Sequence, residues 1–167
     1  MFIKIVGSVL VIVAALVIAG TTPISSTDLA IAQEQKFTAI LSAEEEVPPT
    51  DSEETSMAEF TVTRGDNAIQ YSVTGLYSNL QNVTAAHIHT GKQGENGPIV
   101  VTLFKYDSPK SQVTENGTIT ANKLEGPMAG KQLTDLVTVM NNGETYVNIH
   151  TVQNPNGEVR GQILRSS

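Results

Sequence analysis

The stretch MAEFTVTRGDNAIQYSV, residues 57–73, decides the fold class of this chain. Apolar residues alternate with polar ones on both sides of a turn-forming tetrapeptide at 64–67. Strict alternation is typical of a strand with one buried face, and Gly, Asp and Asn favour tight turns. The stretch therefore predicts a β-hairpin with strands at 57–62 and 68–73.

The same pattern recurs along most of the chain. Turn-rich segments, "TGKQGENGP" (90–98), "YDSPKS" (106–111) and "QNPNG" (153–157), separate the alternating segments. Strands are expected at 37–41, 83–89, 98–104, 117–121, 145–151 and 158–164. Many short strands with Gly, Pro and Asn turns predict an all-β fold, an antiparallel β-sandwich or Greek-key barrel of immunoglobulin-like or superoxide-dismutase-like type.

One segment has a helical period instead. Leu133, Leu136, Val137 and Met140 are spaced as on one face of a helix, and Gly143 is suited to end it. A short crossover helix is expected at 133–142, packed against the sheet.

The N-terminal segment is expected to lie outside this fold. Residues 5–20 are apolar and uncharged and follow Lys4, and an A-x-A pattern at 30–32 resembles a cleavage site. Residues 1–32 are predicted to be a signal peptide, or an uncleaved membrane anchor with a polar linker. The rest, 33–167, is long enough for one domain with its own core. Both alternatives place that domain outside the cytoplasm, secreted or at the cell surface, with membrane contact only through an uncleaved N-terminus.

Composition excludes several classes of function. The chain has no cysteine, so neither a disulfide nor a thiolate is available. Its formal net charge of −7 argues against binding nucleic acid. Asn82 and Asn116 begin N-x-T sequons and are candidate glycosylation sites. The acidic segment 43–54 is interpreted as a solvated loop, with a carboxylate site for a hard cation as the alternative.

All three histidines lie in two segments that share the tripeptide Ile-His-Thr, at 88–90 and 149–151. His87 and His89 belong to "AAHIHTG" (85–91), and His150 belongs to "YVNIHTV" (146–152). Alternation in a strand puts His87 and His89 on one face, with the isoleucines on the other. If the two strands pair, three imidazoles meet.

Three imidazoles are a ligand set suited to one copper or zinc ion, with a position left open for water or a small molecule. Asn148, Glu158 and Arg160 are candidates for the groups that surround the ligating rings and orient them. Arg160, on the same strand face as Glu158, is expected to pair with an acid or to donate to a carbonyl near His150, with contact to a bound anion or substrate as the alternative. The alternative is that the histidines are structural and bond to loop carbonyls.

With these residues assembled, the chain resembles the CHRD domain family, found in chordin and in many exported microbial proteins. The matching blocks are "LSAEEEVPP" (41–49), "AAHIHTGKQGENGPIVVTL" (85–103), "YVNIHT" (146–151) and "NGEVRGQI" (156–163). The resemblance implies an all-β domain over about 36–165 and makes the three histidines signature positions. It supplies no catalytic residues. A looser likeness to copper–zinc superoxide dismutase fails because that enzyme's dinuclear site needs more than three histidines.

Three functions from different classes follow. The first is an exported CHRD protein with a mononuclear copper or zinc site at His87, His89 and His150. The second is a metal-free extracellular interaction module that presents 43–54 and 90–97 to a protein partner. The third, ranked last, is a metal-dependent enzyme, because no nucleophile elbow, catalytic triad order or paired-carboxylate spacing supports catalysis.

Overall fold

The hairpin at the centre of the chain forms as predicted. In the computed structural model, which describes residues 34–63, 65, 67–76 and 80–166, strand β2 (Thr55–Val62) pairs antiparallel with β3 (Ile69–Leu76). The register sets Phe60 opposite Tyr71, and both side chains are buried. Because successive side chains alternate, one face of the hairpin lies in the core.

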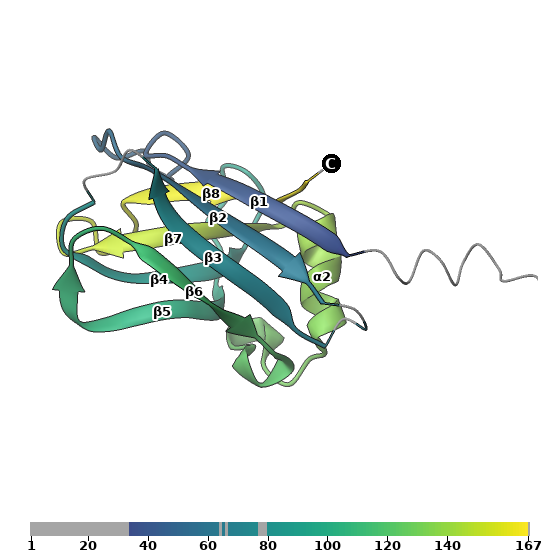
Figure 1. The fold of residues 1–167 in the computed structure, drawn as a ribbon. Coiled ribbons are helices and arrows are strands. Elements are labelled where there is room, and N and C mark those ends of the chain that lie inside the picture. Colours follow the sequence, from purple (N-terminus) through teal and green to yellow (C-terminus); the bar gives the residue numbers. More distant parts are fainter. Residues whose placement is uncertain (1–33, 64, 66, 77–79, 167) are drawn as a thin grey trace, which may run out of the picture.

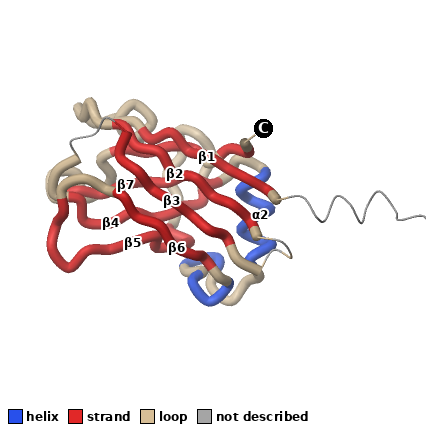
Figure 2. Tube along the Cα trace, in the orientation of Figure 1, coloured by secondary structure: helices blue, strands red, loops and turns tan. Residues whose placement is uncertain are grey.

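Two antiparallel sheets pack face to face (Figure 1). The five-stranded sheet has the order β6-β3-β2-β1-β9, in which β1 is Gln35–Leu41, β6 is Thr114–Ile119 and β9 is Leu164–Arg165. The four-stranded sheet has the order β5-β4-β7-β8, with β4 at Val83–Thr90, β5 at Ile99–Lys110, β7 at Thr145–Thr151 and β8 at Val159–Gln162. The fold is an all-β sandwich, so the predicted class is confirmed (Figure 2).

The facing sides of the two sheets supply the hydrophobic core. Its largest fully buried apolar side chains include Phe37, Leu41, Phe60, Ile69, Ile88 and Ile149. Full burial of one such side chain contributes about 1.5–3 kcal/mol. In a chain without cysteine, this burial takes the stabilising place that disulfides hold in many exported domains.

The predicted crossover helix is also confirmed. Helix α2 (Leu133–Asn141) follows two short 3-10 turns, η1 (Ala121–Lys123) and η2 (Gly126–Met128), and carries the chain from β6 in one sheet to β7 in the other. It lies at one end of the sandwich (Figure 1). A capping box between Gln132 and Asp135 starts it, and Gly143, at φ 66°, follows its end. Its buried residues are the four that gave the helical period, Leu133, Leu136, Val137 and Met140.

Two boundaries differ from the prediction. The segment 106–111, expected to be a turn, is strand almost throughout, because β5 continues to Lys110. Pro109 is tolerated there because β5 is an edge strand with one side free of ladder hydrogen bonds. The expected strand 158–164 is divided between β8 and β9, which belong to different sheets.

The signal-peptide or anchor prediction for residues 1–32 lies outside the described residues. Within the part of the chain that the structure describes, no helix is long and apolar enough to cross a membrane.

Candidate metal centre

Strands β4 and β7 are neighbours, and this places the two histidine motifs together. Their antiparallel register pairs Ala85 with His150, His87 with Asn148 and His89 with Tyr146. Ile88 and Ile149 point inward and are fully buried. The histidines therefore lie on the outer face of the four-stranded sheet, away from the core, as strand alternation predicts.

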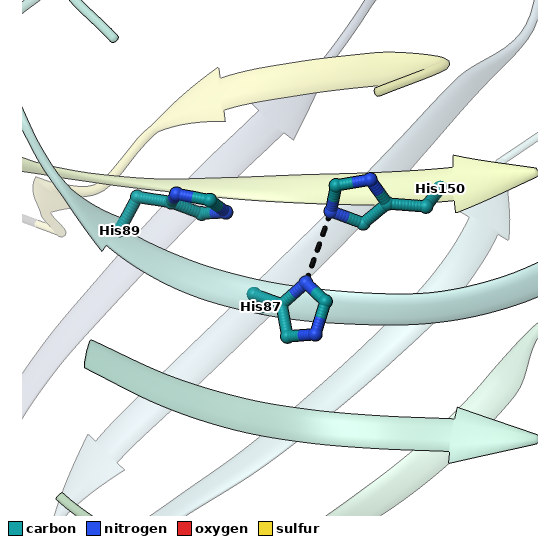
Figure 3. A group of neighbouring side chains, drawn as sticks. All are labelled: His87, His89 and His150. Atoms are coloured by element: carbon teal, nitrogen blue, oxygen red, sulfur yellow. Dashed lines mark hydrogen bonds between the residues drawn. The ribbon is translucent and has the colours of Figure 1, made fainter. Parts of the chain in front are cut away.

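The three rings converge (Figure 3). One nitrogen from each lies within 4.8 Å of those of the other two. The closest pair is His87 Nδ1 and His150 Nε2, at 2.9 Å. Three nitrogens bound to one zinc or copper ion at about 2.0–2.1 Å stand some 3–4 Å apart. Small side-chain rotations therefore suffice to bring all three onto one ion.

Main-chain carbonyls fix the orientation of two rings. His89 Nδ1 lies 2.9 Å from the carbonyl oxygen of Gly97, and His150 Nδ1 lies 2.9 Å from that of Pro155. A carbonyl only accepts, so each Nδ1 carries the proton and each Nε2 has a lone pair. The lone pair of His150 Nε2 accepts the hydrogen bond from His87 Nδ1. Such an outer hydrogen bond is the usual companion of a metal-ligating histidine.

His89 Nε2 is buried and has no hydrogen-bond partner among the described residues. A buried acceptor without a partner costs on the order of 1–3 kcal/mol, so its presence in a folded protein requires an explanation. The nitrogen faces the cluster (Figure 3). A metal ion bound among the three rings would satisfy it.

The surroundings keep the imidazoles neutral. Burial, together with the neighbouring His150, His89 and Lys105, lowers the pKa of His87 to about 4. Burial also lowers the pKa of His89 and of His150, against the opposing effect of their carbonyl partners. Neutral imidazole is the form that binds zinc and copper. The donor set, three imidazoles without thiolate or carboxylate, fits these two metals.

No second cluster of this kind exists among the described residues. Among the described residues, the histidine triad is the only group of three or more His, Asp or Glu side chains close enough together to hold one ion. The alternative of a carboxylate site in 43–54 therefore finds no support in the described geometry.

The three residues expected to orient the ligands bond elsewhere. Asn148, cross-strand from His87, donates from Nδ2 to Glu46 Oε1 at 2.8 Å. Glu158 accepts from Thr151 and Asn154. Burial alone would raise the pKa of Glu158, but these bonds and one from Ser52 hold it below its usual value. In the described structure the carbonyls of Gly97 and Pro155 take the orienting role instead.

Among the described residues, Arg160 forms no ion pair with an acid; its guanidinium binds a loop instead. It is 1% exposed and donates to the carbonyls of Lys92 and Glu95 and to Asn96 Oδ1. Arg160 therefore donates to main-chain carbonyls, as one expectation had it. These carbonyls belong to the loop 91–98 and not to the surroundings of His150. Asn96 in turn donates to the carbonyl of Val47, which ties this loop to the segment 43–54.

Two residues beside the centre were missed at the level of sequence. Tyr146 stacks on His89, with ring centroids 4.8 Å apart and planes 12° from parallel. Its position two residues before Asn148 on the same strand face was a usable signal. Glu46 is 6% exposed, and burial raises its pKa to about 7 against the opposing Arg160 charge. Nothing in "AEEEVPP" separates Glu46 from its acidic neighbours.

Both candidate glycosylation positions are exposed. Asn82 precedes β4, and Asn116 lies on β6, an edge strand of the five-stranded sheet.

The geometry defines a class of protein: a cysteine-free β-sandwich with three converging imidazoles on the outer face of its smaller sheet. The family model of the CHRD domain matches residues 37–163, and the chain belongs to this family. The match spans both histidine motifs and the described core. No curated protein and no solved structure matches the chain.

Proposed function

We propose that this protein is an exported CHRD-domain protein that binds one copper or zinc ion through His87, His89 and His150. The observation that carries the proposal is the convergence of three neutral imidazole nitrogens within 4.8 Å, one of them buried and without a hydrogen-bond partner among the described residues. Three protein ligands leave one position open to solvent or a small molecule.

Metal binding is tested by thermal unfolding and calorimetry of the full-length chain, after chelation, with copper or zinc added. An ion that binds only the folded state at a hundred times its Kd adds about 2.7 kcal/mol of stability. The expected result is one ion per chain and a raised Tm. His89→Ala should abolish both, whereas Gln93→Ala, at an exposed position in the loop that follows β4, should change neither. The absence of a shift with any divalent metal or with copper(I) would refute the proposal.

The competing function is a metal-free interaction module. A groove of about 660 Å³ between 46–52 and 153–158 supports it, because the groove offers a surface to a partner. Pro155, whose carbonyl holds His150, lines this groove. In this case the histidines are structural. Replacing any of them with alanine should then lower the free energy of unfolding equally with and without chelator.

Export rests on the apolar segment 5–20 and on membership of a family of extracellular-type modules. Fractionation of the native host, with N-terminal sequencing of the recovered protein, tests it. Recovery of the uncleaved chain in the cytoplasm would contradict export.

A further inference from the structure

Beside the histidine cluster lies a second buried acceptor without a partner. Asn148 is 3% exposed, and its Oδ1 has no hydrogen-bond partner among the described residues. Asn148 lies directly across from His87 and two residues before His150, on the same face of β7. Directly opposed side chains on neighbouring strands have Cβ atoms about 4.5–5.5 Å apart. Asn148, which carries the unpaired oxygen, is therefore the cross-strand neighbour of His87.

The amide of Asn148 is held in one orientation. Its Nδ2 donates to Glu46 Oε1 at 2.8 Å, so this carboxyl oxygen holds the nitrogen and leaves Oδ1 on the other side. Gly157 covers the pair: a Cβ at this position would collide with Asn148 Nδ2 and lie 2.5 Å from Glu46 Oε1. A flipped amide would set two acceptors, Oδ1 and the carboxylate, against each other.

We infer that Asn148 selects the ligand at the open position of the metal. This inference rests on the proposed function. An amide oxygen only accepts, so it favours a bound molecule that still carries a hydrogen to donate, such as water or ammonia. It disfavours anions that can only accept, such as azide, because two acceptors are then forced together in a buried site. Asn148 is thus a specificity-determining residue, and Glu46 is its positioning residue.

The experiment uses the full-length chain loaded with copper(II), or with cobalt(II) if the site prefers zinc. Azide and ammonia are titrated separately and followed by their visible absorption changes. Asn148→Ala and the nearly isosteric Asn148→Leu should each bind azide about tenfold more tightly and ammonia several-fold more weakly than the unmodified chain. Glu46→Ala should show the same trend to a smaller degree, because it releases the amide.

The use of two probes separates selection from simple crowding. If the variants only enlarge the site, azide and ammonia both bind more tightly, and the inference is wrong. It is also wrong if the ratio of the two affinities does not change in either Asn148 variant. If the unmodified chain binds no metal, the proposed function itself fails, which the metal stoichiometry reveals before any probe is added. The Glu46→Gln variant, which keeps an acceptor for Nδ2, is the matched control and should retain the unmodified ratio.

Discussion

The guanidinium of Arg160 lies 3.5 Å from the centroid of the Tyr146 ring. Tyr146 also stacks on His89, which comes from the strand on its other side, so a buried cation and a candidate metal ligand share one aromatic ring. The same guanidinium donates to two loop carbonyls at 2.9 Å. The loop 91–98 is therefore bound to the sheet twice, through His89 on β4 and through Arg160 on β8.

Replacing Arg160 with lysine should lower the free energy of unfolding by about 2–4 kcal/mol. Lysine keeps the charge but loses the planar fork that reaches several acceptors and stacks on the ring. Urea denaturation measures the change. Arg165→Lys, at an exposed position, is the control and should stay within about 0.5 kcal/mol. Equal stability of the two variants would show that the Arg160 contacts contribute nothing.

Gly97→Ala should weaken metal binding about tenfold or more, as substitutions of groups that orient metal ligands do. An added Cβ would collide with the carbonyl oxygen of Thr90, so the Gly97 carbonyl must move away from His89 Nδ1. Gly94→Ala in the same loop meets no atom within 4 Å and carries only backbone strain. Calorimetric metal titration of both variants makes the comparison, and equal affinities would count against the orienting role of Gly97.

Glu46→Gln should stabilise the protein by about 2–3 kcal/mol at pH 8 and by little at pH 4.5. Burial raises the pKa of Glu46 from 4.5 to about 7. The folded state therefore favours the protonated form, and the stability linked to it is present below pH 4.5 and lost as pH rises through 7. Glutamine keeps the acceptor for Asn148 without the buried charge. Urea denaturation across this pH range provides the measurement, and a gain that does not depend on pH would contradict the explanation.

The metal-free protein should lose stability as pH falls from 6.5 to 4, because the pKa of His87 is lowered from 6.5 to about 4 on folding. In this window the unfolded chain binds the proton more readily, so stability is complete above pH 6.5 and declines as pH falls through 4. Protonation of Glu46 raises the stability over the same pH range and so opposes the effect of His87. The measurement therefore uses the Glu46→Gln variant, in which the free energy of unfolding should fall by about 2–3 kcal/mol. The double variant with His87→Asn should show a shallower decline; an identical decline would exclude His87 as its source.

Much of the fold was predictable from the sequence because it depends on local periodicity. Alternation in 57–73 predicted the hairpin, and the spacing of Leu133, Leu136, Val137 and Met140 predicted helix α2 to within one residue at its end. Strand β5 was underestimated, since Pro109 is compatible with a strand only at a sheet edge, and sheet order is a long-range property.

The sequence by itself determined which side chains can meet. Strand alternation put His87 and His89 on one face, composition removed every thiolate, and the match of the two Ile-His-Thr motifs indicated a shared role. Only the tertiary structure decided that β4 and β7 are neighbours and that Glu46, 102 positions before Asn148, closes over the same face. The physical reason is that periodicity is set by bonds along the chain, whereas strand order and loop burial follow from the packing of distant segments around one core.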